Sequence, residues 1–349
     1  MISERILFVG NTRRNERPYM DPSTRYRCFN IAFSLKELGH VTEVVTMSYF
    51  IENIDIAENF KHIVFHRPSL NDERLLQFLY RNKNKKNLIA DYDDLIFDVS
   101  NIINLPDIEV RDPYLSNVSD YISRNAAANE FFDKFSTSTE PLAEKIKKIK
   151  PSSQVSVISN SLSEDYIQLS TKLYSNNAKR KYKLGYFPGT ASHNNDFKEI
   201  SHFIEIYFKE NKHGNLFILG PLKLPSSLNK FSHRIDHVKS VIPFSHLPYV
   251  KVNVETILAP LSYNEFTACK SGLKFFEAMP LGCQVIATAI PDIDRFESNY
   301  LHKCFELDDW IKLLELKSVS KDHYHNDLEN TLSKISAIAV AKIWEERFL

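Results

Sequence analysis

Glycine is scarce in this sequence, with eight residues among 349. Six of the eight lie between residues 185 and 282. Glycine marks tight turns and positions where the backbone closely approaches a ligand. Loops that bind phosphate are therefore expected in the second half of the chain, and the two halves are predicted to have different tasks.

Cysteine is also rare, and its four residues, Cys28, Cys269, Cys283 and Cys304, lie far apart in the sequence. None forms a Cys-x-x-Cys pair or stands with histidine at zinc-ligand spacing. A disulfide framework and a structural zinc site are excluded on this pattern. The reducing cytoplasm is the compartment that such cysteine usage favours.

The chain has no excess charge, because 44 Lys and Arg residues balance 44 Asp and Glu residues. A dedicated nucleic-acid binder needs a basic excess, so no nucleic acid is expected as a partner. No apolar run approaches the roughly 20 residues of a membrane span, and the apolar run 6–10 is too short for a signal peptide. We expect a cytoplasmic protein, with the inner face of the cell membrane as an alternative location.

Hydrophobic residues are plentiful at 43%, and 349 residues favour two domains over one. Strand and helix patterns alternate along the chain, which is typical of parallel sheets covered by helices. The pattern stops at the polar segment 170–181, a candidate linker, and then restarts. We therefore predict an α/β fold with two doubly wound, Rossmann-like domains: an N-terminal domain over 1–170 and a C-terminal domain over 181–325. A helix over 326–349 would close the chain, with a return to the N-terminal domain as one option.

The most concentrated chemistry lies in the predicted helix 270–279. At about 100° per residue, Lys270, Lys274 and Glu277 would share one face. Two ammonium groups and the amides at the start of this helix could meet a diphosphate at the carboxyl end of a parallel sheet, and Glu277 could accept hydrogen bonds from a ribose. A solvated face with a Lys/Glu pair is the simpler alternative.

A second candidate is the loop that follows the strand 182–187. Gly189 permits close approach of a phosphate, Thr190 can donate a hydrogen bond, and His193 can bind a sugar or phosphate oxygen. An ordinary strand-to-helix turn capped by Asp196 explains the same residues.

The first half contains an acidic cluster, Asp91, Asp93 and Asp94, after the strand 88–90. These residues could line a cleft and bind acceptor hydroxyl groups. Alternatively, they could hold a divalent cation such as Mn²⁺, because hard oxygen ligands suit that ion.

Basic residues also stand near predicted strand ends in the first half. Arg27 could reach a donor phosphate, Arg67 could line the cleft, and His66 could contact the acceptor or act as a base. A surface arginine and a core histidine are the simpler interpretation.

The sequence resembles bacterial glycosyltransferases of group 1, which have the two-domain GT-B fold. The segments that carry the resemblance are, in order, STRYR, DYDDLIFD, STSTEPLAEKI, GYFPGTASHNNDF, LFILGP and KSGLKFFEAMPLGCQVIA. The resemblance covers nearly the whole chain. It implies a nucleotide-sugar donor bound by the C-terminal domain, an acceptor bound mainly by the N-terminal domain, retention of anomeric configuration and no metal or other cofactor.

The resemblance also assigns roles to individual residues. Glu277 matches the glutamate that contacts the ribose, and Gly189 and Thr190 match the loop near the donor phosphates. The first glutamate of the family's E-x7-E pair falls at Cys269, so contacts to the transferred sugar depart from the pattern. The sequence shows K-S-x-x-K-x-x-E instead, which adds Ser271 to the donor site and makes Lys270 and Lys274 the charges that stabilise the leaving diphosphate.

The function predicted from the sequence is transfer of a sugar to a bacterial glycan such as an O-antigen, capsule or other lipid-linked polysaccharide. The basic helix 140–150 could add a weak contact with anionic lipid. Three alternatives remain open: a non-catalytic GT-B scaffold, suggested by Cys269, another GT-B enzyme such as a sugar-nucleotide epimerase, and a metal-dependent, single-domain GT-A glycosyltransferase that uses Asp91, Asp93 and Asp94.

Overall fold

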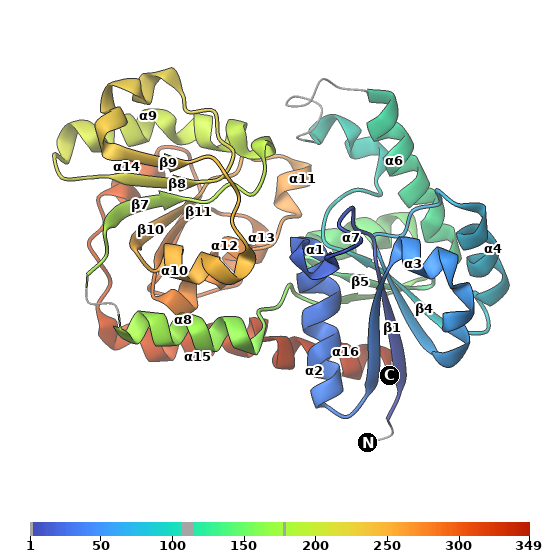
Figure 1. The fold of residues 1–349 in the computed structure, drawn as a ribbon. Helices are drawn as coiled ribbons and strands as arrows, with labels where there is room; N and C mark the ends of the chain where they lie inside the picture. Colours follow the sequence, from blue (N-terminus) through green and yellow to red (C-terminus); the bar gives the residue numbers. More distant parts are fainter. Residues whose placement is uncertain (1–2, 106–114, 177–178) are drawn as a thin grey trace. The chain divides into compact units, whose positions relative to one another are not determined.

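The computed structural model describes residues 3–105, 115–176 and 179–349. Contacts divide the chain into two units (Figure 1). Unit 1 contains residues 1–163, 269–271 and 334–349, and unit 2 contains residues 164–268 and 272–333. The segment 170–181 does not form an extended linker, because helix α8 (Glu164–Asn176) occupies its first part. Residues 177 and 178 of that segment lie outside the described residues.

Unit 1 is built on a parallel sheet of six strands in the order β2-β1-β3-β4-β5-β6. The strands are β1 (Arg5–Gly10), β2 (Val41–Thr46), β3 (His62–His66), β4 (Asn87–Tyr92), β5 (Lys134–Thr137) and β6 (Gln154–Val157). After β1 and β2 the chain returns to the other side of β1 to form β3. The strand order therefore reverses beside β1, where open α/β sheets bind ligands at the carboxyl ends of their strands.

Helices cover both faces of this sheet (Figure 1). They are α1 (Pro22–Thr24), α2 (Asn30–Glu37), α3 (Met47–Glu52), α4 (Glu73–Asn82), α6 (Leu115–Ala128), α7 (Glu140–Ile149) and α16 (Ala337–Phe348). Side chains alternate along β3: Val64 packs in a cluster with α2 and α16, whereas the Phe65 ring contacts Phe50 and Phe78 from α3 and α4. This two-residue period buries both faces of the strand.

Unit 2 has a second parallel sheet, in the order β12-β11-β10-β7-β8-β9. Its strands are β7 (Tyr182–Tyr186), β8 (Leu216–Leu219), β9 (Ile235–Val238), β10 (Val254–Ala259), β11 (Gln284–Thr288) and β12 (Leu301–Cys304). Here the chain passes outward through β8 and β9 and then returns to pair β10 with β7. The reversal point of unit 2 therefore lies between β7 and β10.

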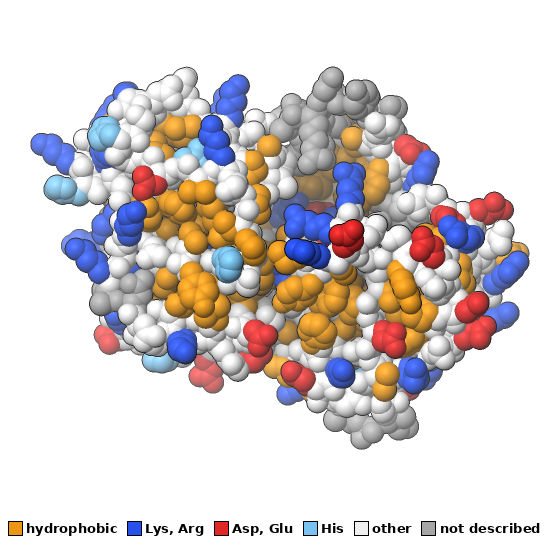
Figure 2. Space-filling model, viewed as in Figure 1, with side chains coloured by type: hydrophobic (Ala, Val, Ile, Leu, Met, Phe, Trp, Pro, Cys, Tyr) orange, Lys and Arg blue, Asp and Glu red, His pale blue; other side chains and the backbone are white. Residues whose placement is uncertain are grey.

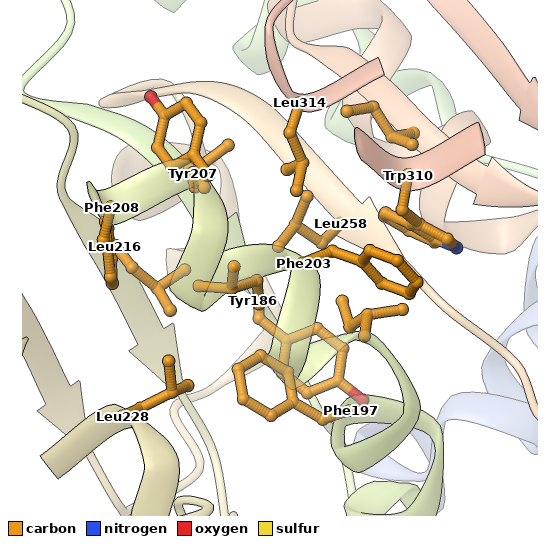
Figure 3. Packing of buried hydrophobic residues seen from close by; sticks show 14 of the residues in the cluster. Tyr186, Phe197, Phe203, Tyr207, Phe208, Leu216, Leu228, Leu258, Trp310 and Leu314 are labelled. Atoms are coloured by element: carbon orange, nitrogen blue, oxygen red, sulfur yellow. The ribbon is translucent and has the colours of Figure 1, made fainter. Parts of the chain in front are cut away.

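The helices of unit 2 are α8, α9 (Asn194–Glu210), α10 (Leu247–Lys251), α11 (Glu265–Ala268), α12 (Leu273–Ala278), α13 (Pro291–Asp294), α14 (Asp309–Leu314) and α15 (Tyr324–Ile335). One core packs α9 and α14 against the sheet through Phe197, Phe203 and Trp310 (Figure 3). The same cluster includes Tyr186 and Leu258 from the two strands at the reversal point. This packing fixes the strand ends from which the candidate donor loops emerge.

Short helical segments connect these elements. They comprise a π-helical turn at Arg25–Phe29 and 3-10 turns at Pro18–Met20, Ile54–Asn59, Val99–Asn104, Asn129–Phe131, Ala191–His193, Ser226–Arg234, Phe244–His246, Met279–Leu281 and Lys321–His323.

The two six-stranded parallel sheets confirm the predicted pair of Rossmann-like domains. The single-domain GT-A alternative is wrong, since each half of the chain forms its own sheet. A helix closes the chain as predicted, but the segment 326–349 is not one helix, because Ser336 separates α15 from α16. Its backbone is extended, its hydroxyl accepts a hydrogen bond from the Ala339 amide at 3.4 Å, and it forms an isolated bridge with Leu162. Strands β9 and β12 have no strong apolar pattern and were missed.

None of the helices in the described part of the chain is long and apolar enough to cross a membrane. On the face shown in Figure 2, basic and acidic side chains are interspersed, as expected from equal numbers of the two.

Candidate functional site

The reversal point of unit 2 brings two loops together. One loop follows β7 and the other follows β10, and the amide of Ser262 in the second donates to Asp196 Oδ1 at the start of α9 over 2.9 Å. The other oxygen, Asp196 Oδ2, lies 2.8 Å from His193 Nδ1. Asp196 therefore does not act as a simple helix cap, because its carboxylate links the two loops and orients His193.

Three charged side chains, Lys251, Lys274 and Glu277, gather beside the first of these loops, and we call them the cationic cluster. Lys251 comes from the end of α10, while Lys274 and Glu277 share one face of α12. Lys251 Nζ forms an ion pair with Glu277 Oε2, and Lys274 Nζ donates to the backbone carbonyl of Phe187 over 2.8 Å. These three side chains sum to one positive charge when both lysines are protonated.

Burial makes this charge costly. The side chain of Lys251 is only 2% exposed, and its ammonium group lies 5.3 Å from the centre of the Phe187 ring. Burial, and to a smaller extent the positive charge of Lys251, lowers the pKa of Lys274 to about 8. An anion bound here would offset the positive charge and stabilise the protonated form of Lys274.

The loop after β7 offers space next to its backbone. A Cβ atom added to Gly189 would meet no heavy atom within 4 Å, and the hydroxyl of Thr190 is exposed, 2.5 Å from that of Ser192. Gly220, after β8, has φ of +132°, and a Cβ atom there would lie 1.9 Å from the carbonyl oxygen of Pro188. Only glycine fits at residue 220, so this contact fixes the path of the loop.

Helix α12 begins later than the sequence predicts. It starts at Leu273, so Lys270 lies outside the helix and does not share a face with Lys274. The amide of Gly272, just before the helix, donates to Asp292 Oδ2 over 2.7 Å. Asp292 is buried, and burial raises the pKa of its carboxyl group despite the nearby Arg295. The expected diphosphate contact with amides at the start of this helix is not supported, because a carboxylate already accepts from one of them.

Unit 1 contains a second group of charged side chains, at the ends of β3 and β4. His66, Arg67, Asp93, Asp94 and Lys270 form what we call the paired cluster. Arg67 Nε lies 2.6 Å from Asp93 Oδ1, Arg67 Nη2 lies 2.8 Å from Asp94 Oδ2, and Lys270 Nζ lies 2.5 Å from Asp94 Oδ1. The positive charges of Arg67 and Lys270 thus balance the negative charges of two carboxylates. The sequence names all five residues, but does not predict that Lys270 joins Asp94.

Arg67 has a strained backbone conformation. Its φ is 52°, which is left-handed and uncommon for a residue with a side chain. Its amide donates to the carbonyl of Asp91 over 2.8 Å, and its carbonyl accepts from Asn11 Nδ2 at 2.9 Å. Such strain costs on the order of 1–3 kcal/mol and is typical of functional sites. Asn11 follows β1 and Arg67 follows β3, so the strain lies at the reversal point of unit 1.

His66 is fully buried, and its Nε2 lies 3.1 Å from Asp93 Oδ1. Burial by itself would raise the pKa of Asp93, but Arg67 and His66 outweigh that effect and hold the pKa well below its usual value. Asp93 is thus an anion held in place by two neighbours. The expectation that His66 contacts an acceptor or acts as its base is not supported, because no part of His66 reaches the surface.

Arg27 is also fully buried, within the π-helical turn that precedes α2. Its Nε and Nη2 bind both oxygens of Asp91 at 3.1 and 2.6 Å, and Nη2 also donates to Ser136 Oγ at 3.1 Å. The expectation that Arg27 binds a donor phosphate is therefore wrong. Asp91 is likewise removed from the candidate metal ligands, because it serves as the partner of this guanidinium group.

Three residues, Cys269 to Ser271, belong to unit 1 although the flanking helices α11 and α12 belong to unit 2. Thr139 Oγ1 donates to the carbonyl of Cys269 over 2.9 Å, and Asn160 Nδ2 donates to Ser271 Oγ over 2.8 Å. The side chain of Cys269 is buried. Ser271 is thus held within unit 1 by its hydrogen bond with Asn160.

A cavity of about 290 Å³ opens among the loops after β1, β2 and β3 in unit 1. Met47 and Ile51 contribute apolar surface, and the other lining side chains are polar: Asn11, Thr12, Asn15, Ser48, Glu52, Asn71, Asp72 and Arg74. Asn11 joins this cavity to the paired cluster through its hydrogen bond with the Arg67 carbonyl.

Within residues 3–105, 115–176 and 179–349, no group of three or more His, Cys, Asp or Glu side chains is placed to hold a metal ion. The carboxylates of the paired cluster instead meet arginine and lysine, as described above.

Sequence reasoning missed Lys251 entirely. It lies in a mainly apolar stretch, VIPFSHLPYVKVN, without a clear helical period, and the pairing with Glu277 joins residues 26 positions apart in the sequence. The only available signal was the short apolar and aromatic run LPYV that precedes it.

No family model and no curated protein matches the sequence. Several solved structures are similar to the chain over its whole length. HepE from Anabaena, in complex with UDP and glucose, is 13% identical with a TM-score of 0.54, and the match covers 98% of each chain. AviGT4, a glycosyltransferase involved in avilamycin A biosynthesis, is 11% identical with a TM-score of 0.59, and the match covers 99% of this chain and 97% of that chain.

A putative UDP-N-acetylglucosamine 2-epimerase from Listeria monocytogenes is also similar, at 10% identity and a TM-score of 0.55, with 98% of this chain and 94% of that chain covered. At such low identity these matches establish the GT-B fold, in agreement with the sequence. They include both a transferase and a putative epimerase, so the choice of activity depends on the sites.

Proposed function

We propose that this chain is a glycosyltransferase that moves a sugar from a nucleoside diphosphate to a hydroxyl group of a bacterial glycan, with retention of configuration and without a metal ion. The observation that carries the proposal is the cationic cluster at the reversal point of unit 2. A buried excess of positive charge fits the diphosphate that a sugar donor contributes and that departs in the reaction.

In this proposal Lys274 binds the diphosphate and Glu277 accepts hydrogen bonds from the ribose. Gly189, Thr190 and His193 line the approach of the phosphates. The bond between the anomeric carbon and the diphosphate oxygen breaks, the acceptor oxygen bonds to the same carbon, and the acceptor proton passes to the departing diphosphate. The ammonium group of Lys274 stabilises the charge that develops on the diphosphate, so no protein nucleophile is needed.

The acceptor is proposed to bind to unit 1. The carboxyl groups of Asp93 and Asp94 are held by Arg67 and can accept hydrogen bonds from sugar hydroxyls. The adjoining cavity of about 290 Å³ is lined mostly by polar side chains and has room for a sugar unit. This combination supports a glycan rather than an apolar acceptor.

A surface polysaccharide or its lipid-linked precursor is the acceptor class we propose. Membrane contact through α7 gains little support from the structure. Lys147 donates to the carbonyl of Ser153, and Lys150 donates to the carbonyls of Asn129 and Phe132, at 2.9 and 2.7 Å. These ammonium groups are engaged within unit 1 rather than presented to lipid.

Binding of nucleotides tests the proposal. UDP, GDP, ADP, CDP and CMP, each with EDTA or with Mn²⁺, are added to the full chain, and the melting temperature is recorded, because a ligand that binds the native state raises it. The proposal predicts that one nucleoside diphosphate raises the melting temperature in EDTA. A shift only with Mn²⁺ would contradict metal independence, and no shift with any nucleotide at millimolar concentration would favour the scaffold.

The epimerase is the second candidate function, because a putative epimerase shares the fold. Incubation of the protein with UDP-N-acetylglucosamine in D₂O distinguishes the two activities by NMR. An epimerase must exchange the proton at the inverted carbon. A transferase leaves that proton in place and, with a suitable glycan, lengthens the acceptor.

A further inference from the structure

Lys251 is a buried ammonium group that the proposed chemistry does not by itself require. It stands at the end of α10, with its side chain 2% exposed. A buried charge is costly unless it is paired. The structure provides the partner, Glu277 Oε2, and the face of the Phe187 ring 5.3 Å away. Two side chains from separate segments, Glu277 of α12 and Phe187 after β7, thus contact this one ammonium group.

The partner of Lys251 is the residue proposed to recognise the ribose. A carboxylate offers about four lone pairs to hydrogen-bond donors, and the ammonium group engages one oxygen of Glu277. The backbone of Glu277 is held as well, because Tyr166 Oη donates to its carbonyl over 3.0 Å and the Tyr166 ring stacks on Phe244 at 4.9 Å. The carboxylate is thereby fixed in orientation before any ligand arrives.

We propose that Lys251 is a positioning residue for nucleotide recognition, which holds the Glu277 carboxylate oriented toward the ribose hydroxyl groups of a nucleoside diphosphate. The inference rests on the proposed function and extends it to a residue outside the predicted site. Lys251 acts through Glu277, so its loss removes discrimination between ribose and deoxyribose more than it removes affinity for the diphosphate.

The test compares ribonucleotide with deoxynucleotide binding. Dissociation constants are measured calorimetrically in EDTA for UDP, or for the diphosphate of the base that the panel selects, and for its 2′-deoxy and 3′-deoxy analogues. Because a hydrogen bond to a charged group contributes about 1.5–3 kcal/mol, the wild-type chain should prefer the ribonucleotide roughly 10-fold to 100-fold. Glu277→Gln should reduce this preference.

Lys251→Met is expected to lower the preference to about threefold or less while the affinity for the deoxy analogue changes little. Lys251→Arg retains the charge and should restore much of the preference. In a Glu277→Gln background, Lys251→Met should have no further effect on the preference. The matched control is Lys230→Met, because Lys230 also pairs with a glutamate in unit 2, at 2.6 Å from Glu205, but is 55% exposed.

A purely structural role for Lys251 would weaken binding of all three nucleotides alike, and that result would overturn the inference. An unchanged preference in Lys251→Met would overturn it too. If Lys251→Met fails to fold, Lys251→Gln removes the charge but keeps a hydrogen-bond donor, and it must show the same reduced preference. A wild-type chain that binds no nucleoside diphosphate would instead refute the proposed function.

A second readout concerns Lys274, whose pKa depends on its neighbours. The charged groups that act on it are Lys251, which lowers the pKa, and Glu277 and Asp196, which raise it, in addition to burial. Lys251→Met should therefore raise the pKa of Lys274 and shift the pH dependence of nucleotide binding to higher pH. An unchanged pH profile would contradict the close electrostatic contact between the two lysines.

Discussion

The paired cluster of unit 1 and the cationic cluster of unit 2 use similar residues in opposite ways. In the paired cluster, Arg67 and Lys270 meet Asp93 and Asp94, and the charges cancel. In the cationic cluster, Lys251 pairs with Glu277, whereas Lys274 donates to a backbone carbonyl. A cluster whose charges cancel is held together by its own ion pairs. A cluster with an excess positive charge is stabilised when it binds an anion. This difference separates the proposed acceptor and donor sites.

The largest effect should come from breaking the ion pair beneath the paired cluster. Arg27→Met leaves the carboxylate of Asp91 buried at 2% exposure without its partner. Removing one member of a buried pair costs about 3–5 kcal/mol. We expect that loss in the free energy of unfolding, measured by urea denaturation at pH 7.

Arg74→Met is the matched control, because the pair of Arg74 with Asp72 has an arginine side chain that is 58% exposed. Its cost should stay below about 1 kcal/mol. Equal losses in the two variants would show that burial does not distinguish these pairs.

Removing the ammonium group of Lys274 should mainly affect ligand binding. Lys274→Ala is expected to weaken binding of the nucleoside diphosphate roughly 30-fold to 100-fold, since charge-assisted hydrogen bonds contribute about 2–3 kcal/mol. Calorimetry in EDTA measures the loss. Lys230→Ala serves as the control at an exposed site in unit 2. Unchanged affinity in Lys274→Ala would remove the cationic cluster from the donor site.

The buried ammonium group of Lys274 should lower the free energy of unfolding when no ligand is bound. The pKa of Lys274 is about 8 in the folded chain and near its usual 10.5 when unfolded. Between these values the unfolded chain binds more protons, so stability should rise with pH from 8 to 10.5; below pH 8 the full cost is present. Lys274→Met should therefore raise the free energy of unfolding at pH 7, by about 1–3 kcal/mol since the side chain is only half-buried.

Urea denaturation of wild type and Lys274→Met from pH 7 to pH 10.5 measures this difference. The two curves should approach each other as the pH rises. A variant that is less stable than wild type at pH 7 would contradict the electrostatic cost assigned to Lys274.

The smallest effect is expected at the edge of the paired cluster. Lys270 and Asp94 are 28% and 21% exposed, so solvent partly screens their pair, and Arg67, the other partner of Asp94, keeps its ion pair with Asp93. Asp94→Asn should reduce the free energy of unfolding by about 0.5–1 kcal/mol. In the proposed enzyme it should raise the KM for the acceptor and leave the dissociation constant of the nucleotide unchanged.

The sequence predicts the fold well because strands and helices leave local periodic patterns. The segments 6–10 and 62–67 contain buried strands, and the alternation with helices predicts a parallel sheet. The start of α12 is less predictable, since it depends on Asp292 accepting from the Gly272 amide across 20 residues. Local patterns also explain what could be predicted of the candidate site. Lys274 and Glu277 were predicted to share one face because both lie on the same helix.

For the remaining candidate site residues, burial determines whether the side chain can contact a ligand. Burial is a property of the tertiary structure. Arg27 and His66 look like ligand-binding groups near strand ends, but each is enclosed by partners from distant segments. Lys251 reaches Glu277 from another helix and has no local signature. A single sequence reveals the residue types near strand ends. It does not reveal which of these side chains are buried and paired with other residues of the chain.

The most direct test of the unbalanced cationic cluster is the number of protons taken up when the nucleoside diphosphate binds. At pH 8, Lys274 with a pKa of about 8 is half protonated, and the bound diphosphate should complete its protonation. Calorimetry in two buffers of different ionisation enthalpy should show about half a proton more taken up by wild type than by Lys274→Arg, whose guanidinium is always charged. Equal proton uptake by the two proteins, with both binding the nucleotide, would contradict the account.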